Sequence, residues 1–175
     1  MSRLPNLLAA LLASAALGGP TMAEPTFASK AQAMTYLAAT LPKASSENPK
    51  YTTKRDGTIS QWLTDEVSFA AGGDGAVEVT MRERYTQTQG GKTQSSTHEA
   101  RFSLADVAVE EFTEDGDATP TGAPARGVIF RCAKAGCIAA NWGGAPSRAD
   151  KSDIYIQDEA TRAKVLAAFR RLQTA

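Results

Sequence analysis

The chain has 175 residues and carries 19 lysine and arginine residues against 19 aspartate and glutamate residues, so its formal net charge is zero. A balanced charge gives no electrostatic basis for binding nucleic acid or an anionic membrane surface. The composition therefore excludes strongly basic binding proteins, and we expect no nucleic-acid partner.

Residues 1–23 have the three parts of a secretory signal peptide. Arg3 precedes an apolar run from residue 7 to residue 17, and the segment ends in small residues around Ala23. The apolar run is too short to span a bilayer. We expect cleavage near Ala23, a periplasmic or secreted location, and a single domain with no membrane anchor in the mature chain.

Residues 24–60 are predicted to form an N-terminal helix followed by a polar segment. Ser29 and Gln32 have the spacing of a capping box at a helix start, and Pro42 is expected to end the helix. The segment 43–60 is polar and fits either a loop or a weak hairpin. The apolar residues at helical spacing are Ala31, Met34, Leu37, Ala38 and Leu41.

The clearest local pattern is a β-hairpin centred on Gly90-Gly91, since two glycines accept the positive φ angles of a two-residue hairpin loop. Centring the turn there places the apolar residues of both strands on one face of the sheet. A slip of one residue would scatter them over both faces, so the pattern specifies the register. The predicted apolar pairs are Val77–Leu104, Val79–Phe102 and Met81–Ala100.

The rest of the chain alternates strand patterns with turns and ends in a helix. Segments 127–132 and 137–142 are predicted to pair as a second tight hairpin, and 143–152 is predicted to be a loop. Asp158 can cap the closing helix, whose apolar stripe is Ala163, Val165, Leu166, Phe169 and Leu172. Strands are expected near residues 66–71, 76–88, 93–104, 107–112, 127–132, 137–142 and 153–157.

This order of elements resembles a pleckstrin-homology-like barrel over residues 66–173, and the glycine- and proline-rich segment 113–126 falls where that fold passes between its two sheets. The resemblance implies a mainly β (α+β) fold. Residues 61–175 would form a small antiparallel seven-stranded barrel, grouped four and three and closed by the C-terminal helix, with the N-terminal helix added. It also implies a binding scaffold. The family's phosphoinositide ligand is not expected, because the loop at residues 70–76 carries no cation.

The two cysteines, Cys132 and Cys137, stand opposite each other in the predicted second hairpin, at a separation that a disulfide can bridge. Export would supply an oxidising compartment. A metal site needs more ligands than two thiols and one histidine, and the C-x-x-C spacing of redox motifs is missing. We predict a structural disulfide, with two unpaired core cysteines as the alternative, and no bound metal or cofactor.

Three residues, His98, Glu83 and Trp142, are candidates for a binding site. The hairpin register puts His98 opposite Glu83, where a carboxylate would favour the charged imidazole and raise its pKa; the alternative is an exposed cross-strand pair at the barrel rim. Trp142 precedes a glycine-rich turn. Like Trp62, it could line a groove or serve as a core anchor.

An acidic run follows the first hairpin, and its spacing does not match the calcium loop of an EF-hand. Such a run is typical of a solvated face, although it could steer a basic partner. Its members are Asp106, Glu110, Glu111, Glu114, Asp115 and Asp117.

No nucleophile set, metal set or phosphate-binding loop is visible in the sequence. We therefore expect an exported, non-catalytic binding or interaction module with an unknown protein or small-molecule partner. The alternatives are a small periplasmic hydrolase, whose residues meet only on folding, and a lipocalin-like carrier of an apolar ligand.

Overall fold

The structure is a computed structural model that describes residues 26–47, 50–53, 57–114 and 124–174. The predicted signal segment 1–23 lies outside these residues. In chain order the elements are α1 (Lys30–Glu47), β1 (Lys50–Thr53), β2 (Ile59–Ala71), a short 3-10 turn (Gly73–Gly75), β3 (Val77–Gln89), β4 (Lys92–Ser103), β5 (Val107–Glu114), β6 (Ala125–Cys132), β7 (Ile138–Trp142), β8 (Ala145–Ala149), β9 (Lys151–Tyr155) and α2 (Glu159–Gln173).

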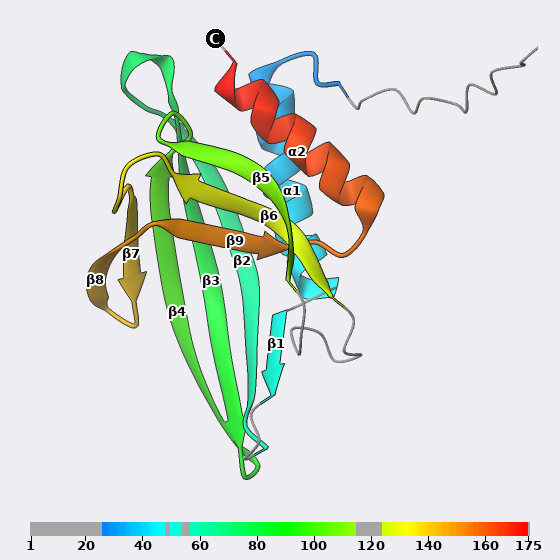
Figure 1. The fold of residues 1–175 in the computed structure, drawn as a ribbon, viewed down its shortest axis with the longest axis vertical. Coiled ribbons are helices and arrows are strands. Elements are labelled where there is room, and N and C mark those ends of the chain that lie inside the picture. The colour runs from blue at the N-terminus through cyan, green and yellow to red at the C-terminus, as the bar shows by residue number, and fades with distance from the viewer. Residues whose placement is uncertain (1–25, 48–49, 54–56, 115–123, 175) are drawn as a thin grey trace, which may run out of the picture.

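The strands form two antiparallel sheets, one of six strands in the order β1-β2-β3-β4-β7-β8 and one of three in the order β5-β6-β9. Figure 1 shows the smaller sheet crossing one half of the long strands β2, β3 and β4, with both helices packed at one side. The fold is mainly β with a helix near each end, as predicted. Among the described strands no pairing joins the two sheets, so they do not form a closed barrel, and nine strands replace the expected seven.

The predicted β3–β4 hairpin is confirmed residue for residue. Val79 pairs with Phe102 and Met81 with Ala100, and Leu104 donates its backbone N–H to the carbonyl of Val77. All six predicted apolar residues are buried. The alternation of apolar and polar residues therefore specifies this register, as the sequence indicated.

Three phenylalanines connect the layers of the core. The ring of Phe102 on β4 lies 4.8 Å from that of Phe130 on β6, which lies 5.0 Å from that of Phe169 on α2. Asp158 caps α2 by accepting a hydrogen bond from the Thr161 N–H, as predicted. The buried face of α2 differs slightly from the predicted stripe, because Ala163 is exposed and Ala168 is buried instead.

Helix α1 does not end at Pro42, as the sequence suggested, but continues to Glu47. A proline inside a helix removes one hydrogen bond and crowds the preceding turn. Here the turn that follows it is buried against β2 through Ala44 and Ser45, and this packing offsets the loss. At its N-terminus Ser29 accepts from the Gln32 N–H as predicted, whereas the Gln32 side chain accepts from Ala28.

Ser45 stabilises a bulge in β2 that the sequence analysis did not find. The register of β2 with β3 shifts between Thr64 and Glu66, and the Thr64 N–H donates to Ser45 Oγ at 2.7 Å. A bulge inserts one residue and changes the direction of the side chains that follow. Because of it, Thr64 lies on the same face as the core residue Val67, although the two positions differ by an odd number.

Replacing Ser45 by alanine is expected to lower the free energy of unfolding by about 1–2 kcal/mol, because a buried N–H at Thr64 would lose its acceptor. Urea unfolding of the full chain measures this. Ser46→Ala is the matched control, since the Ser46 hydroxyl is exposed and donates only within its own helix. Equal effects of the two substitutions would contradict the role given to Ser45.

The predicted pairing of 127–132 with 137–142 is wrong. β6 pairs with β5 and β9, whereas β7 pairs with β4 and β8, so the chain changes sheets between them. The Cys132–Cys137 disulfide is nevertheless present, with α-carbons 5.6 Å apart. It bridges the connection between the sheets rather than two strands of one hairpin. The predicted passage at 113–126 is also wrong, because β5 and β6 are neighbours in one sheet.

The segment 143–152, expected to be a loop, contains β8 and the start of β9. β8 pairs with β7 around a turn in which Gly143 and Gly144 have positive φ angles, the geometry that glycine allows. Part of the earlier polar segment also forms a strand, because β1 pairs with the start of β2. Among the described residues, no helix combines the length and apolar character needed to cross a membrane.

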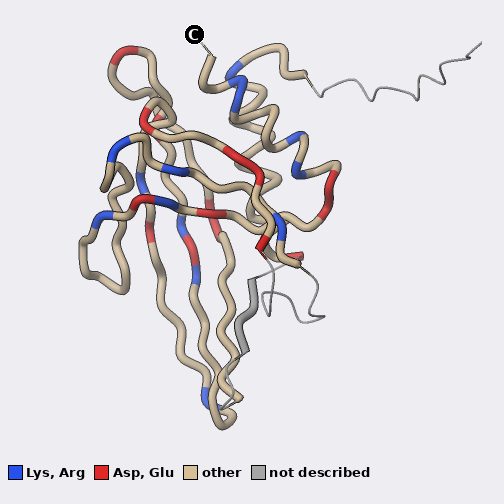
Figure 2. Tube along the Cα trace, viewed as in Figure 1, with Lys and Arg blue, Asp and Glu red and all other residues tan. Residues whose placement is uncertain are grey.

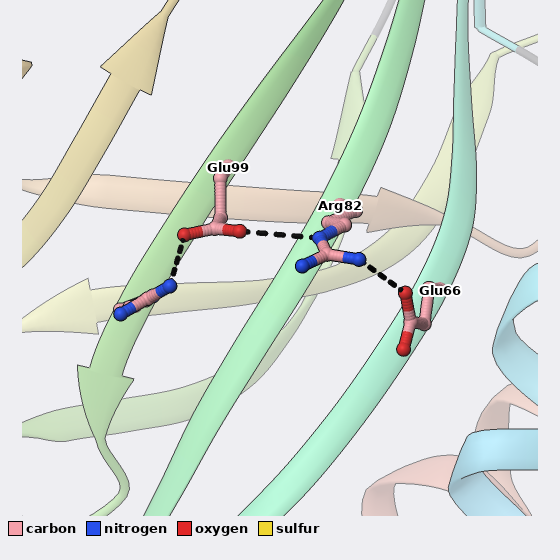
Figure 3. A network of polar contacts seen from close by, with 4 residues as sticks. Glu66, Arg82 and Glu99 are labelled. Carbon is pink, nitrogen blue, oxygen red and sulfur yellow. Dashed lines mark hydrogen bonds and ion pairs between the residues drawn. The ribbon is translucent and has the colours of Figure 1, made fainter.

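The outer face of the six-stranded sheet carries charged side chains in a row across three strands. Arg82 on β3 contacts Glu66 on β2 at 3.0 Å and Glu99 on β4 at 3.2 Å, as Figure 3 shows. Nearby, Arg84 contacts Asp65, the bulged residue, at 2.8 Å. Exposed pairs of this kind stabilise little individually. Their position leaves the inner face of the same strands mainly to apolar, aromatic and uncharged polar residues, with Glu83 and, at the hairpin turn, Lys92 as the charged ones.

Candidate functional site

A cavity of about 180 Å³ lies between the two sheets, next to β9, where the three-stranded sheet stops covering the long strands. The larger sheet contributes residues from β2, β3, β4, β7 and β8, the smaller sheet contributes residues from β9, and α1 contributes Ser45. The side chains that matter below are Trp62, Thr64, Glu83, His98 and Trp142.

Strand pairing brings the three candidate residues of the sequence analysis together. His98 pairs with Glu83 on one side and with Trp142 on the other. Opposite residues of an antiparallel pair share a face, so all three lie on the inner face and line the cavity.

Four rings form an aromatic cluster at the mouth of this cavity. The centroid of Trp62 lies 4.5 Å from Tyr85, 5.2 Å from His98 and 5.7 Å from Trp142. The His98 and Trp142 rings are 4.8 Å apart. These separations are typical of tilted and edge-to-face packing, so the rings hold one another in place.

His98 is buried, with 9% of its surface exposed, so the expected exposed pair at a barrel rim is wrong. Its Nε2 shares a 2.8 Å hydrogen bond with Ser96 Oγ. Among the side chains that the structure describes, His98 Nδ1 is the buried polar atom that lacks a hydrogen-bond partner.

The pKa of His98 is lowered, not raised as predicted from its position opposite Glu83. Burial is the cause, since desolvation penalises the charged imidazolium. The Trp62 and Trp142 rings that pack on the imidazole exclude the water that would stabilise its charge. His98 is therefore neutral near pH 7.

Trp142 is not a core anchor. It is 45% exposed, which is unusual for so large an apolar side chain, and it lies at the end of β7 with one side against His98. Trp62 is half-buried on the other side of the cluster. The chain's two tryptophans therefore both belong to the mouth of the cavity.

β9 closes the cavity from the smaller sheet. Ile154 contributes an apolar surface, while Ser152 and Asp153 contribute polar atoms. The Tyr155 hydroxyl donates to Glu114 Oε2 at 2.6 Å, and burial, followed by this bond, raises its pKa. Tyr155 therefore stays protonated in the working range of a protein.

The acidic run is only partly a solvated face, because three of its members bind side chains of the same protein. Glu110 pairs with Arg131, Glu111 with the buried Arg162, and Glu114 accepts from Tyr155. Two further members, Asp115 and Asp117, lie outside the described residues. The structure therefore gives the run a structural role at the edge of the smaller sheet.

No protein-family model, curated protein or solved structure matches this chain. Its site is therefore interpreted from the geometry above.

Two residues of the site were missed in the sequence and one was placed only loosely. Tyr85 and Ser96 could have been found from the hairpin register. They pair with each other two positions closer to the turn than Glu83 and His98, and therefore lie on the same face. Trp62 reaches that face through the bulge at residue 65, for which the sequence has no signal. Its pairing with Tyr85 completes the aromatic cluster.

Proposed function

We propose that the protein is an exported, non-catalytic binding module, and that its cavity at Trp62, His98 and Trp142 holds a small ligand with an apolar face and hydrogen-bonding groups. The observation that carries the proposal is the unpartnered Nδ1 of His98 beside that cavity. Binding sites are typically concave, mostly apolar and provided with a few polar groups that orient the ligand.

An unpartnered buried polar atom is rare and destabilising, so its presence calls for a reason. Leaving such an atom without a partner costs about 1–3 kcal/mol. A ligand that hydrogen-bonds to Nδ1, after a small movement of the covering rings, would recover this energy on binding. The neutral imidazole can offer either a donor or an acceptor at that nitrogen, depending on its tautomer.

The exposed Trp142 supports the same reading. A large aromatic surface in contact with water gains free energy when a ligand covers it, and tryptophan is enriched where partners bind. Trp142 lies on the cavity wall next to the histidine rather than on a distant surface. One ligand could therefore contact both groups at once.

Export to the periplasm or outside the cell is part of the proposal. The disulfide fits an extracytoplasmic location, since such bonds persist in oxidising compartments. The signal at residues 1–23 rests on the sequence alone. A relation to pleckstrin-homology-like folds is likewise a proposal, supported by the antiparallel strands and the C-terminal helix and opposed by the grouping of six and three strands.

A carrier of an apolar ligand is less well supported. The cavity of about 180 Å³ is smaller than common ligand pockets, and Glu83, Thr64 and Ser45 line it. A wholly apolar molecule would cover those polar groups without offering them a hydrogen bond.

One observation favours a hydrolase as the second candidate. Ser96 Oγ and His98 Nε2 are 2.8 Å apart, the contact of a nucleophile with its base. A working triad also needs a group that orients the histidine through Nδ1, and here that atom has no partner. Hydrolysis of p-nitrophenyl acetate that disappears in Ser96→Ala would favour this candidate over the binding module.

Native mass spectrometry tests the binding proposal directly. The full chain is exposed to the small-molecule fraction of a bacterial extract, desalted and weighed without denaturation. We expect a retained small molecule on the wild type and a loss of about tenfold or more in occupancy for Trp142→Ala, because the variant removes the ring over His98.

Ile59→Ala is the matched control. Ile59 is another exposed large apolar residue, 44% exposed against 45% for Trp142, and it does not line the cavity. Retention by Ile59→Ala but not Trp142→Ala supports the site. No retained molecule on the wild type, or equal retention by all three proteins, overturns the proposal.

A further inference from the structure

We infer that the ligand is a neutral carbohydrate chain, which enters the cavity at His98 and continues along the inner face of β2, β3 and β4 toward the β3–β4 turn. This inference rests on the proposed function and specifies its ligand class. The residues that would form the path are Ser60 and Trp62 on β2, Tyr85 and Gln87 on β3, and Gln94 and Ser96 on β4. Trp62 also lines the cavity, and Ser60 is buried and acts through its bond to Tyr85.

These six residues share one face by register. Trp62 pairs with Tyr85 and Ser60 with Gln87, while Ser96 and Gln94 are the partners of Tyr85 and Gln87 on the other side. Residues opposite each other on paired strands lie on the same face, and so do residues two positions apart on one strand. The face therefore continues from the pair Glu83–His98 at the cavity to the pair Gln87–Gln94, a distance of about 13 Å at the rise of a strand.

The path carries no charge. In β2 from Ile59 to Thr64, and in the hairpin from Tyr85 to Thr97, Lys92 at the turn is the one charged residue. Figure 2 shows the same contrast, with charged residues in the upper parts of these strands and at the tip but none between. Between the cavity and the turn, these stretches of β2, β3 and β4 offer an anionic ligand no cation and a cationic ligand no carboxylate, so this part of the lining is complementary to a neutral chain. The charged residues next to it are Glu83 in the cavity, Lys92 at the turn and Lys50 on β1, which pairs with Trp62.

The polar groups of the path suit hydroxyl groups. Ser60 Oγ and Tyr85 Oη share a hydrogen bond of 2.9 Å, and the Tyr85 hydroxyl donates to Gln87 Oε1 at 3.3 Å. Hydroxyl and amide side chains both donate and accept, as each sugar hydroxyl does. The existing bonds hold Tyr85 and Gln87 in place, so a ligand would meet an ordered surface.

The aromatic rings supply the second component of carbohydrate recognition. The face of an aromatic ring is electron-rich and attracts the weakly positive C–H groups on the apolar side of a sugar ring. Trp62 and Trp142 line the cavity, and Tyr85 packs on Trp62 where the path begins. His98 Nδ1, buried and unpartnered, would be matched by a hydroxyl at the end of the chain.

An extended polypeptide fits this path less well. Peptides that bind sheets commonly add a strand to an exposed edge and use its backbone groups. Here the proposed path runs over the face of β2, β3 and β4, where side chains are offered. A peptide would instead add to the edge of β4 before His98, because β7 pairs with β4 only from His98 to Arg101. Peptide binding is therefore an outcome that would count against the inference.

The test begins with an array that carries neutral glycans, acidic glycans and unmodified peptides. The array is probed with the full chain. We expect binding to neutral glycans. The bound oligosaccharide and its monosaccharide are then titrated while tryptophan emission is recorded. Since both tryptophans line the cavity, emission reports this site alone. The oligosaccharide is expected to bind about tenfold or more tightly than the monosaccharide, because it covers the path as well as the cavity.

A pair of double variants locates the path. Gln87→Ala with Gln94→Ala removes the amide pair on the inner face, and we expect about a tenfold loss of oligosaccharide affinity with little change for the monosaccharide. Thr86→Ala with Ser95→Ala removes the neighbouring opposed pair on the outer face and is the matched control, expected to bind as the wild type does.

The outcomes separate this inference from the proposed function. Binding of acidic glycans or peptides alone, or equal losses in the two double variants, overturns the carbohydrate path. A small molecule retained in native mass spectrometry without binding to any neutral glycan overturns the inference and leaves the proposed function standing. Failure of both experiments overturns both.

Discussion

Phe130→Ala is expected to lower the free energy of unfolding by about 3–5 kcal/mol, the range found for large aromatic truncations in cores. Phe130 is fully buried and contacts both Phe102 of the larger sheet and Phe169 of α2. Its removal would leave a cavity at the point where the three layers meet. Urea unfolding followed by circular dichroism measures the change.

Phe112→Ala is the control for that substitution. Phe112 lies in the same sheet but is only half-buried, on the face away from Phe130, where it packs edge-on against Tyr155. We expect a smaller loss of about 1–2 kcal/mol for it. Should the two variants prove equally unstable, the sheets and α2 would not share one core centred on Phe130.

His98→Phe is expected to stabilise the protein, by about 1–3 kcal/mol, while abolishing ligand binding. The substitution removes an unpartnered buried nitrogen, whose desolvation is a cost that the folded state now bears. The lost bond to Ser96 matters less, because Ser96 is half-exposed and can bind water. The adjacent cavity can accept the larger ring. Thermal unfolding and native mass spectrometry measure the two effects.

Opposite changes in stability and binding are typical of residues kept for function. A purely structural histidine would behave differently, since its replacement would lower stability and leave retained ligand unchanged. A loss of stability in His98→Phe would therefore contradict the role of Nδ1. Ser96→Ala, which removes the partner of Nε2 and leaves Nδ1 unchanged, is the control.

The same histidine links stability to pH. Because burial lowers its pKa in the folded state, the unfolded chain takes up the proton first as pH falls. The stability that neutral His98 contributes is fully present above the pKa of the unfolded state, about 6.5. It is lost as pH falls from there through the lower pKa of the folded state. The other titratable side chains next to the imidazole are Glu83 and Tyr85 on β3, whereas the packed tryptophans carry no charge.

Some of the fold could be predicted because local patterns specify it. The β3–β4 register follows from the alternation around Gly90-Gly91, where any other register would expose Val79 and Phe102. The cap of α2 at Asp158 is equally local. Both features depend on residues close together in the sequence, which is why the pattern was sufficient.

Other features depend on distant parts of the chain. β6 and β7 have the pattern of a hairpin, yet each finds a better-matched partner in a different sheet. The disulfide was predicted correctly from a wrong pairing, because five residues' separation keeps the cysteines close in either arrangement. Helix α1 passes Pro42 because β2 covers its last turn, and the sequence of the helix does not contain that fact.

The candidate site shows the same division. Glu83 and His98 were placed together by the hairpin register, and Trp142 joins them only because β7 pairs with β4. The expected pKa of His98 was wrong in direction, since the sequence showed the carboxylate opposite it but not the two tryptophans that exclude water. Burial, a property of the assembled fold, outweighs one nearby charge.

The central claim is that the binding cavity is built around a buried, neutral imidazole. Nuclear magnetic resonance titration of the histidine ring tests it most directly, and its signals need no assignment because the chain has one histidine. We predict a pKa below the ordinary value of about 6.5 for the folded protein. A pKa at or above that value would show an exposed or carboxylate-paired histidine and would contradict the account. A drop of this pKa in Glu83→Gln would identify the carboxylate as the cause.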